Sequence, residues 1–255
     1  MMAPIFILIK REILIFFKKS FISYLFYIFI FPIILYLFLV SPFHNLLQPG
    51  SGMNYLYHGL PAILFLSTLI ISFGFPLIIS QRDRYQSDYF YFLSSLNINN
   101  YHYSAYIILI SLLLSYIQFI VSLFLVYNLS GSIFITWKQI FYFILIIFPS
   151  SLIFTLLGLF FSNFIKTTYS LIMSFVFVFL FLAFGIGSFI PIEYFPDNYR
   201  DFTESYNFIF HLYYMFIKIF QNENIHLGVP ISAFFISFLL YILNLVISSK
   251  KMSKY

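Results

Sequence analysis

The sequence predicts an all-α integral membrane protein with six membrane-spanning helices. An interfacial helix is expected before the first span, and a re-entrant or amphipathic helix is expected on the outer side between the fifth and sixth spans. Of the 255 residues, 62% are hydrophobic and 8% are charged, whereas a soluble domain carries roughly 25% charged residues. The few charges leave long uncharged runs, and about 20 apolar residues suffice to cross a bilayer core of about 30 Å.

The uncharged runs indicate where the six spans lie. The run between Lys19 and Arg82 is long enough for two helices joined by a turn, and each of the other runs holds one helix. The expected spans cover residues 21–43, 56–80, 103–127, 137–161, 168–190 and 229–249. Because Ser-Pro-Phe-His follows the first apolar run, we expect a retained span there and no cleaved secretory signal. We interpret residues 1–255 as a single transmembrane domain.

The basic residues predict the orientation. Lys and Arg stay preferentially on the cytoplasmic side of a membrane. With the N-terminus inside, ten of the 13 Lys and Arg residues fall in cytoplasmic segments, and five of the eight acidic residues fall outside. We therefore expect both termini in the cytoplasm and the protein in the cytoplasmic (inner) membrane, in contact with its lipids.

A mostly apolar segment with a few charges precedes the first span at residues 1–20. Its charged residues are Lys10, Arg11, Glu12, Lys18 and Lys19. Three of the basic residues fall on one helical stripe, which is typical of a helix that lies in the membrane interface. The alternative is a basic flank that only orients the first span.

The most polar cytoplasmic segment is expected to be a loop at residues 81–102. Its charged residues include Arg82, Asp83, Arg84 and Asp88, and they lie beside aromatic residues. Aromatic and Arg side chains anchor protein interfaces, so we predict a docking surface here. The alternative is that the aromatic residues lie at the depth of the lipid headgroups.

The longest outer segment is expected at residues 191–228. Large apolar residues recur in it at helical spacing, namely Phe202, Tyr206, Ile209, Phe210, Tyr213, Phe216, Ile217 and Phe220. The opposite stripe holds Glu204, Asn207, His211 and Lys218. We expect one amphipathic helix over 202–220, either at the outer interface or partly re-entrant. A seventh span is the rival interpretation, although ionisable groups on that helix would be costly in lipid.

Motifs for catalysis and for metal or nucleotide binding are absent from the sequence. There is no cysteine, no Gly-x-x-x-x-Gly-Lys-Ser/Thr loop and no His-Glu-x-x-His pattern. Asp197 and Asp201 could chelate Mg²⁺, although a solvated turn explains the same pair. The interiors of the predicted spans contain no Asp, Glu, Lys or Arg, which argues against ion coupling. No Lys or Arg run exceeds two residues, so a nucleic-acid partner is not expected.

Five short motifs occur in a characteristic order. They are residues 9–19, Tyr-His-Gly-Leu-Pro at 57–61, Gln81 through Asp88, Leu157-Gly158-Leu159-Phe160 with Lys166-Thr167, and Pro191-x-x-x-x-Pro196 with Asn207. In this order they resemble the ABC-2 family of ABC-exporter permeases. In that family they mark the interfacial helix, the second span, the coupling loop, the end of the fourth span and the outer re-entrant segment. Tyr85 and Gln86 depart from the Gly-Thr that the coupling loop often carries.

The resemblance implies a type V exporter-like fold and a role as the permease subunit of an ATP-driven ABC exporter, without enzyme activity or a cofactor of its own. Separate ATPase subunits, which would bind ATP and Mg²⁺, would dock on the interfacial helix and the coupling loop, and a second permease copy or paralogue would complete a dimer. The docking candidates are Arg11, Glu12, Arg82, Asp83, Arg84 and Asp88. The outer-segment candidates are Pro191, Glu193, Pro196, Glu204, Asn207 and His211.

Two alternative functions belong to different classes. One is a haem-exporter-type permease of cytochrome c maturation, for which a His-rich outer site would be expected. The other is a membrane-embedded prenyl- or acyltransferase, which would need acids or histidines that converge near one membrane face. A structural assembly subunit is a third interpretation.

Overall fold

The computed structural model describes residues 3–15, 18, 21–47, 55–85, 100–130, 136–165, 167–223 and 228–252, and the regular secondary structure within them is helical. Six segments in this part of the chain are long and apolar enough to cross a membrane. They are Tyr24–His44, Leu56–Asp83, Tyr101–Leu129, Trp137–Ser162, Thr168–Gly185 and Gly228–Ile247. The six-span prediction is therefore confirmed. The apolar helix Phe208–Phe220 is about 20 Å long, which is too short for a seventh span.

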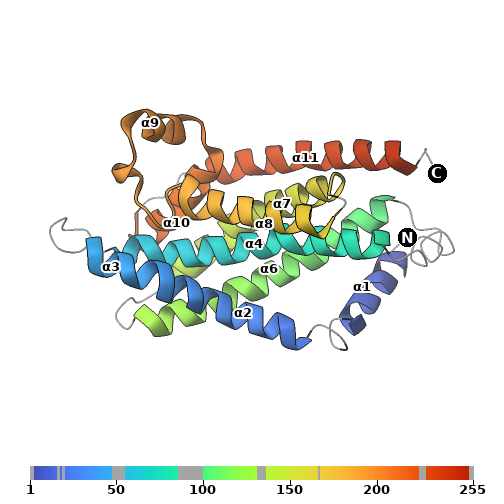
Figure 1. The fold of residues 1–255 in the computed structure, drawn as a ribbon, viewed down its shortest axis with the longest axis horizontal. Helices are drawn as coiled ribbons and strands as arrows, with labels where there is room; N and C mark the ends of the chain where they lie inside the picture. The colour runs from blue at the N-terminus through green and yellow to red at the C-terminus, as the bar shows by residue number, and fades with distance from the viewer. Residues whose placement is uncertain are drawn as a thin grey trace.

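The first span follows a separate N-terminal helix. Helix α1 (Ala3–Ile15) lies at an angle to the long axis of the bundle (Figure 1). The span begins as α2 (Phe21–Leu35), continues through a π-helical turn at Tyr36–Val40 and ends as α3 (Ser41–Leu47). Pro32 lies inside α2 and has no N–H to donate to the carbonyl of Ile28. The side-chain amide of Gln118 donates to that carbonyl at 3.2 Å instead, which ties α2 to the third span.

Helix α4 (Leu56–Tyr85) is the centre of the bundle. It packs along both α6 (Asn100–Ser130) and α7 (Trp137–Ser162) (Figure 1). Within the most apolar part of each span, 94% of the residues of α4 are buried, compared with 22% for α2–α3, 17% for α8 (Thr168–Leu180) and 22% for α11 (Gly228–Met252). The peripheral helices α2–α3, α8 and α11 therefore have most of their surface exposed on the outside of the bundle.

Small residues allow the central helices to approach closely. Between α4 and α6, the hydroxyl groups of Ser67 and Ser122 lie 2.9 Å apart, and those of Ser72 and Ser115 lie 2.7 Å apart. Between α4 and α7, a Cβ atom at Gly158 would overlap the backbone carbonyl oxygen of Phe73. Small and hydroxyl-bearing residues are typical of contacts between membrane-spanning helices, where close backbone approach replaces a hydrophobic driving force.

The segment between α8 and α11 differs from the single amphipathic helix predicted over 202–220. A 3₁₀ turn (Ile192–Tyr194) is followed by two helices, α9 (Asp197–Tyr206) and α10 (Phe208–Phe220). The helix ends at Asn207 because its backbone is extended (φ −84°, ψ 96°) and its side chain accepts hydrogen bonds from the N–H groups of Ile209 and Phe210, as an N-cap residue does. Helix α9 protrudes from the bundle, whereas α10 packs against α4, α7 and α11 (Figure 1).

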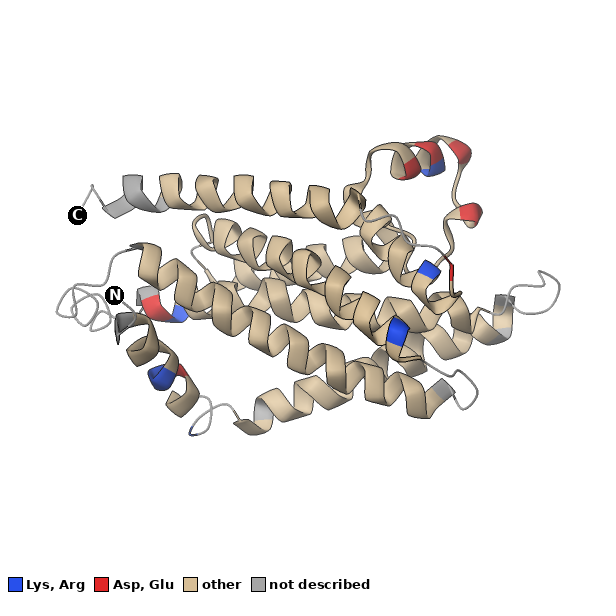
Figure 2. Cartoon of the chain, turned by 180° about the vertical axis from the view of Figure 1, so that it is seen from behind, with Lys and Arg blue, Asp and Glu red and all other residues tan. Residues whose placement is uncertain are grey.

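The charged residues in the described part of the chain gather at the two ends of the bundle, and the long helices between them are almost free of charge (Figure 2). We call these the α1 end and the α9 end. Helix α4 continues through Tyr85, so the loop predicted at 81–102 is helical at its start, and α6 already begins at Asn100. The rest of that loop, including Asp88, lies outside the described residues.

Candidate functional site

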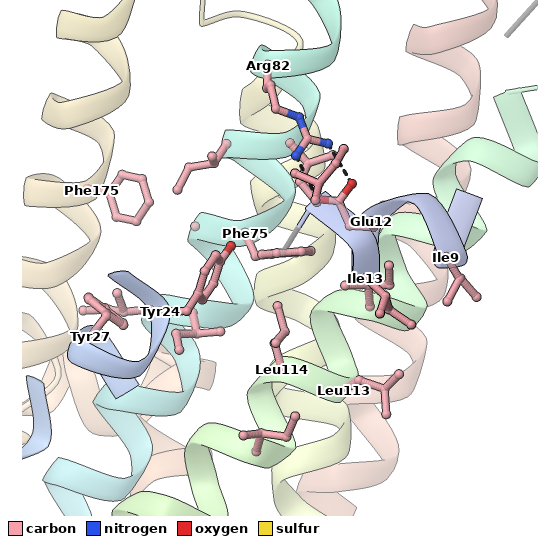
Figure 3. Close-up of a pocket in the computed structure, with 18 residues that line it drawn as sticks. Ile9, Glu12, Ile13, Tyr24, Tyr27, Phe75, Arg82, Leu113, Leu114 and Phe175 are labelled. Atoms are coloured by element: carbon pink, nitrogen blue, oxygen red, sulfur yellow. Dashed lines mark hydrogen bonds and ion pairs between the residues drawn. The ribbon is translucent and has the colours of Figure 1, made fainter. Parts of the chain in front are cut away.

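The α1 end contains a cluster of paired charges, which we call the charge cluster. Arg82 on α4 donates two hydrogen bonds of 2.8 Å to the two carboxylate oxygens of Glu12 on α1 (Figure 3). Arg82 also lies 3.1 Å from a carboxylate oxygen of Asp83, and Arg11 of α1 reaches the same oxygen at 3.3 Å. Two cations and two carboxylates thus join α1 to the end of α4.

Two tyrosines of α6 complete the charge cluster. The Tyr106 hydroxyl donates to Glu12 at 2.9 Å, and the Tyr103 hydroxyl donates to Asp83 at 3.1 Å. The Glu12 and Asp83 side chains are only 8% and 2% exposed. Carboxylates so deeply buried are stable only when they are paired and hydrogen-bonded, and here each accepts bonds from both a guanidinium and a phenol. The cluster therefore holds α1, α4 and α6 in one arrangement.

The structure brings together four of the six predicted docking residues, Arg11, Glu12, Arg82 and Asp83. The side chain of Arg84 and the whole of Asp88 lie outside what the structure describes. The pairing of Glu12 with Arg82 and the hydrogen bonds from Tyr103 and Tyr106 were not predicted from the sequence. The Tyr-x-x-Tyr spacing at the start of the third span was a usable signal, because residues three apart lie on the same face of a helix.

The α9 end contains a second cluster, in which Tyr55, just before α4, and side chains of α4 and α10 donate to backbone carbonyl groups. We call it the carbonyl cluster. The Tyr55 hydroxyl donates to the carbonyl of Phe189 at 2.6 Å, and Nε2 of His58 lies 2.9 Å from the carbonyl of Gly187. Gly187 has a positive φ of 72°, which favours glycine and turns the chain after α8 back toward α4. The carbonyl cluster thus holds the segment after the fifth span against the start of α4.

Tyr213 lies at the centre of the carbonyl cluster and is fully buried. Its hydroxyl is 2.8 Å from the carbonyl of His58 and 2.9 Å from the carbonyl of Ser188, so it joins α10 to both α4 and the segment after α8. Burial raises the pKa of Tyr213 well above its usual value. The phenol therefore keeps the proton that it donates to these carbonyls.

The predicted outer-segment residues occupy different environments. Asn207 caps α10, Pro191 and Pro196 precede the 3₁₀ turn and α9, Glu193 and Glu204 are exposed, and His211 is half-buried. The apolar stripe is buried at Phe210, Tyr213, Phe216, Ile217 and Phe220, which lie in α10. Its first two members do not follow the prediction, because Phe202 is 59% and Tyr206 is 77% exposed on the protruding α9.

Of the pair Asp197 and Asp201, Asp197 forms an ion pair within its own helix. Its carboxylate lies 3.1 Å from Arg200, one turn further along α9. Among the residues that the structure describes, no group of three or more His, Asp or Glu side chains is placed to hold a metal ion. In the described part of the chain, hydrogen bonds hold this end together, and Asp197 and Arg200 form an exposed ion pair on α9.

A family model described as ABC-2 type transporter matches residues 4–221, from α1 to the end of α10. The chain belongs to the ABC-2 type transporter family. It is therefore a multi-pass membrane protein and a transmembrane permease subunit of an ABC transporter, a class of subunit that works with ABC ATPases. No curated protein and no solved structure matches this ABC-2 permease.

Proposed function

We propose that this ABC-2 permease exports its substrate across the cytoplasmic membrane, with energy from ATP hydrolysed by separate subunits that dock at the α1 end. The observation that carries the proposal is the charge cluster. Because Glu12 and Arg82 join α1 to α4, an ATPase subunit that displaced α1 would displace the end of α4 with it. ATP and Mg²⁺ would be bound by those subunits.

The charge distribution supports a cytoplasmic α1 end. Lys10, Arg11 and Arg82 lie there, whereas the α9 end carries the acidic residues of the segment after α8 (Figure 2). Basic residues favour the cytoplasmic side. This orientation places the ATPase subunits beside α1 and the carbonyl cluster on the outer side.

Helix α4 offers a direct mechanical link between the two ends. Its 30 residues, which include Pro61 and Pro76, form one helix of about 45 Å, with Arg82 near one end and His58 near the other. In the proposed mechanism, ATP-driven movement at the α1 end shifts α4 and separates His58 from Gly187 and Tyr213. The carbonyl cluster would then open and release the substrate outward.

We further propose that a second permease, either identical or paralogous, covers part of the peripheral helices. Only 17–22% of the most apolar parts of α2–α3, α8 and α11 is buried within one chain. In a membrane such faces are covered by lipid or by another protein. The two permeases together would enclose the substrate path.

The orientation is tested with reporters fused to the chain. A reporter placed after Tyr255, or at Tyr85, should report a cytoplasmic location, and one placed at Asn198 should report the outer side. A cytoplasmic signal at Asn198 would contradict the proposed orientation and with it the direction of export.

Docking is tested by charge reversal in the segment after α4. Reversing Arg82 and Arg84 together should weaken co-purification of an ATPase subunit that carries a phosphate-loop motif, or should uncouple its ATP hydrolysis from the permease. Arg84→Glu combined with Asp88→Lys separates docking from loss of the charge cluster, because this variant leaves Arg11, Glu12, Arg82 and Asp83 unchanged. Arg200→Glu at the α9 end is the matched control. Wild-type co-purification and coupling in both variants of the segment after α4 would exclude docking there.

A further inference from the structure

An elongated apolar cavity lies beside the charge cluster. It has a volume of about 730 Å³ and is walled by α1, α2, α4, α6 and α8 (Figure 3). Thirteen of its 18 lining residues are Ile, Leu or Phe. The volume falls in the range of ligand-binding pockets, roughly 300–1,000 Å³. The cavity shares Glu12 and Arg82 with the charge cluster and has no lining residue in common with the carbonyl cluster.

The cavity has one polar end and one apolar end. Arg82 and Glu12 lie at the polar end (Figure 3), and the lining residues of α4 extend from there to Ile70. Twelve residues of helix correspond to about 18 Å, which is close to half of a bilayer core of about 30 Å. The cavity therefore has the depth of one membrane leaflet, with its charged end at the membrane surface.

The mouth of the cavity faces the surroundings of the bundle. Of the lining residues, Ile13, Ile78, Leu113 and Ile117 are 45–60% exposed, whereas Ile71 and Leu114 are 6% and 8% exposed. The exposed ones come from α1, α4 and α6, and α4 and α6 are membrane-spanning helices. The medium at this mouth is hydrocarbon rather than water, and an apolar cavity offers water too few hydrogen-bond partners.

We propose that this cavity binds one acyl chain of a phospholipid from the leaflet on the α1 side. The chain would lie along α4 between Ile70 and Ile79, and the polar part of the lipid would lie at the end marked by Glu12 and Arg82. Within the charge cluster, Arg11 and Arg82 balance Glu12 and Asp83, so recognition rests on the hydrocarbon chain rather than on a charged headgroup. The bound chain fills the space between α1 and the bundle and so supports the position of α1.

The proposal is tested with a photoactivatable lipid in vesicles. The probe is a phosphatidylethanolamine with a diazirine midway along one acyl chain, in vesicles of phosphatidylethanolamine and phosphatidylglycerol that contain the full chain. After illumination, labelled residues are mapped by mass spectrometry. Labels should concentrate on residues 70–79 and 110–117. An even distribution of labels over the exposed faces of α2, α8 and α11 would overturn the proposal. This arm of the test uses the wild-type protein alone, so it does not depend on whether a variant folds.

Variants that fill the cavity provide the second arm. Leu114→Trp and Ile71→Phe each place extra volume in the cavity, and each should lower labelling of 70–79 by roughly tenfold, the loss expected when about two methylene groups lose their burial. Leu109→Trp is the matched control, because Leu109 lies on the same helix, is 47% exposed and does not line the cavity. Unchanged labelling in a folded Leu114→Trp or Ile71→Phe protein would refute the site.

Native mass spectrometry identifies the occupant. A phospholipid retained by the wild-type protein, and lost from Leu114→Trp but not from Leu109→Trp, is the expected result. Retention of another apolar molecule, such as a transported amphiphile, would overturn the assignment to phospholipid. These measurements use the permease without ATP or ATPase subunits, so they succeed or fail independently of the proposed docking and export.

Discussion

Removal of Arg82 should destabilise the permease far more than removal of an exposed arginine. Arg82 donates two 2.8 Å bonds to Glu12 and lies 3.1 Å from Asp83. The variant Arg82→Gln retains a polar side chain but removes the charge. Two carboxylates that are 8% and 2% exposed would then lose the guanidinium that lies between them. The matched variant is Arg200→Gln, because Arg200 also pairs with an aspartate at 3.1 Å, but in a pair whose side chains are 37% and 83% exposed.

The expected magnitudes differ because the burial differs. Removal of one partner from a buried ion pair costs about 3–5 kcal/mol, and the 26% exposure of Arg82 lowers this to about 2–3 kcal/mol through solvent screening. An exposed pair contributes about 0–1 kcal/mol. Since 1 kcal/mol shifts the unfolding midpoint of a chain of this size by about 2–4 °C, we expect a decrease of roughly 4–12 °C for Arg82→Gln.

The assay is thermal unfolding of the detergent-purified permease, followed by circular dichroism at one heating rate, because such proteins often unfold irreversibly. The double variant Glu12→Gln with Arg82→Gln should lose less stability than the two single variants added together, because neutralising both partners removes the unpaired charge between them. Equal midpoints for Arg82→Gln and Arg200→Gln, or strict additivity in the double variant, would refute the reasoning.

Three further variants, with Gly228→Ala as a control, test helix packing, the α10 cap and the carbonyl cluster, and each is compared with the wild type in the same unfolding assay. Gly158→Ala should cost about 1–3 kcal/mol because its Cβ would overlap the carbonyl oxygen of Phe73, whereas Gly228→Ala, with no atom within 4 Å of its Cβ, should cost little. Asn207→Ala should cost about 0.5–2 kcal/mol through loss of the α10 cap. Tyr213→Phe should cost about 1–3 kcal/mol, because the carbonyls of the carbonyl cluster lose a buried donor; a neutral effect would show that these carbonyls have another partner.

The six spans could be predicted because a charge is costly in hydrocarbon, and the positions without charges therefore outline the spans. The same reasoning from charges predicted that the second span ends at residue 80, whereas α4 continues through Tyr85. Arg82 and Asp83 were assigned to a loop, yet both belong to the helix. Their charges are compensated by Glu12 and Arg11, which are about 70 residues away in the sequence. No local pattern reveals a partner at that distance, so the charge cluster became visible only in three dimensions.

The break between α9 and α10 was missed for a different reason. The large apolar residues keep a helical spacing through Asn207, and the periodicity suggested one continuous helix. A local signal was nevertheless present, because asparagine before an apolar run is a common N-cap. With the break, α9 leaves the bundle and exposes Phe202 and Tyr206, whereas α10 turns inward and buries Tyr213 and Phe216.

The position of the two clusters on α4 explains why the most buried helix can also be the moving part of the proposed mechanism. Both clusters attach a short peripheral segment to an end of α4: α1 through Glu12, and the segment after α8 through His58. The attachments are polar bonds, which exchange partners more readily than a packed core can be rearranged. Between the clusters, α4 contacts α6 through paired serines and α7 through the glycine contact at Gly158, and such small-residue surfaces permit one helix to slide along another without opening a large void. A displacement at the α1 end would therefore be carried to the carbonyl cluster by α4 as a unit, and the substitutions that most impair transport should lie at its two ends.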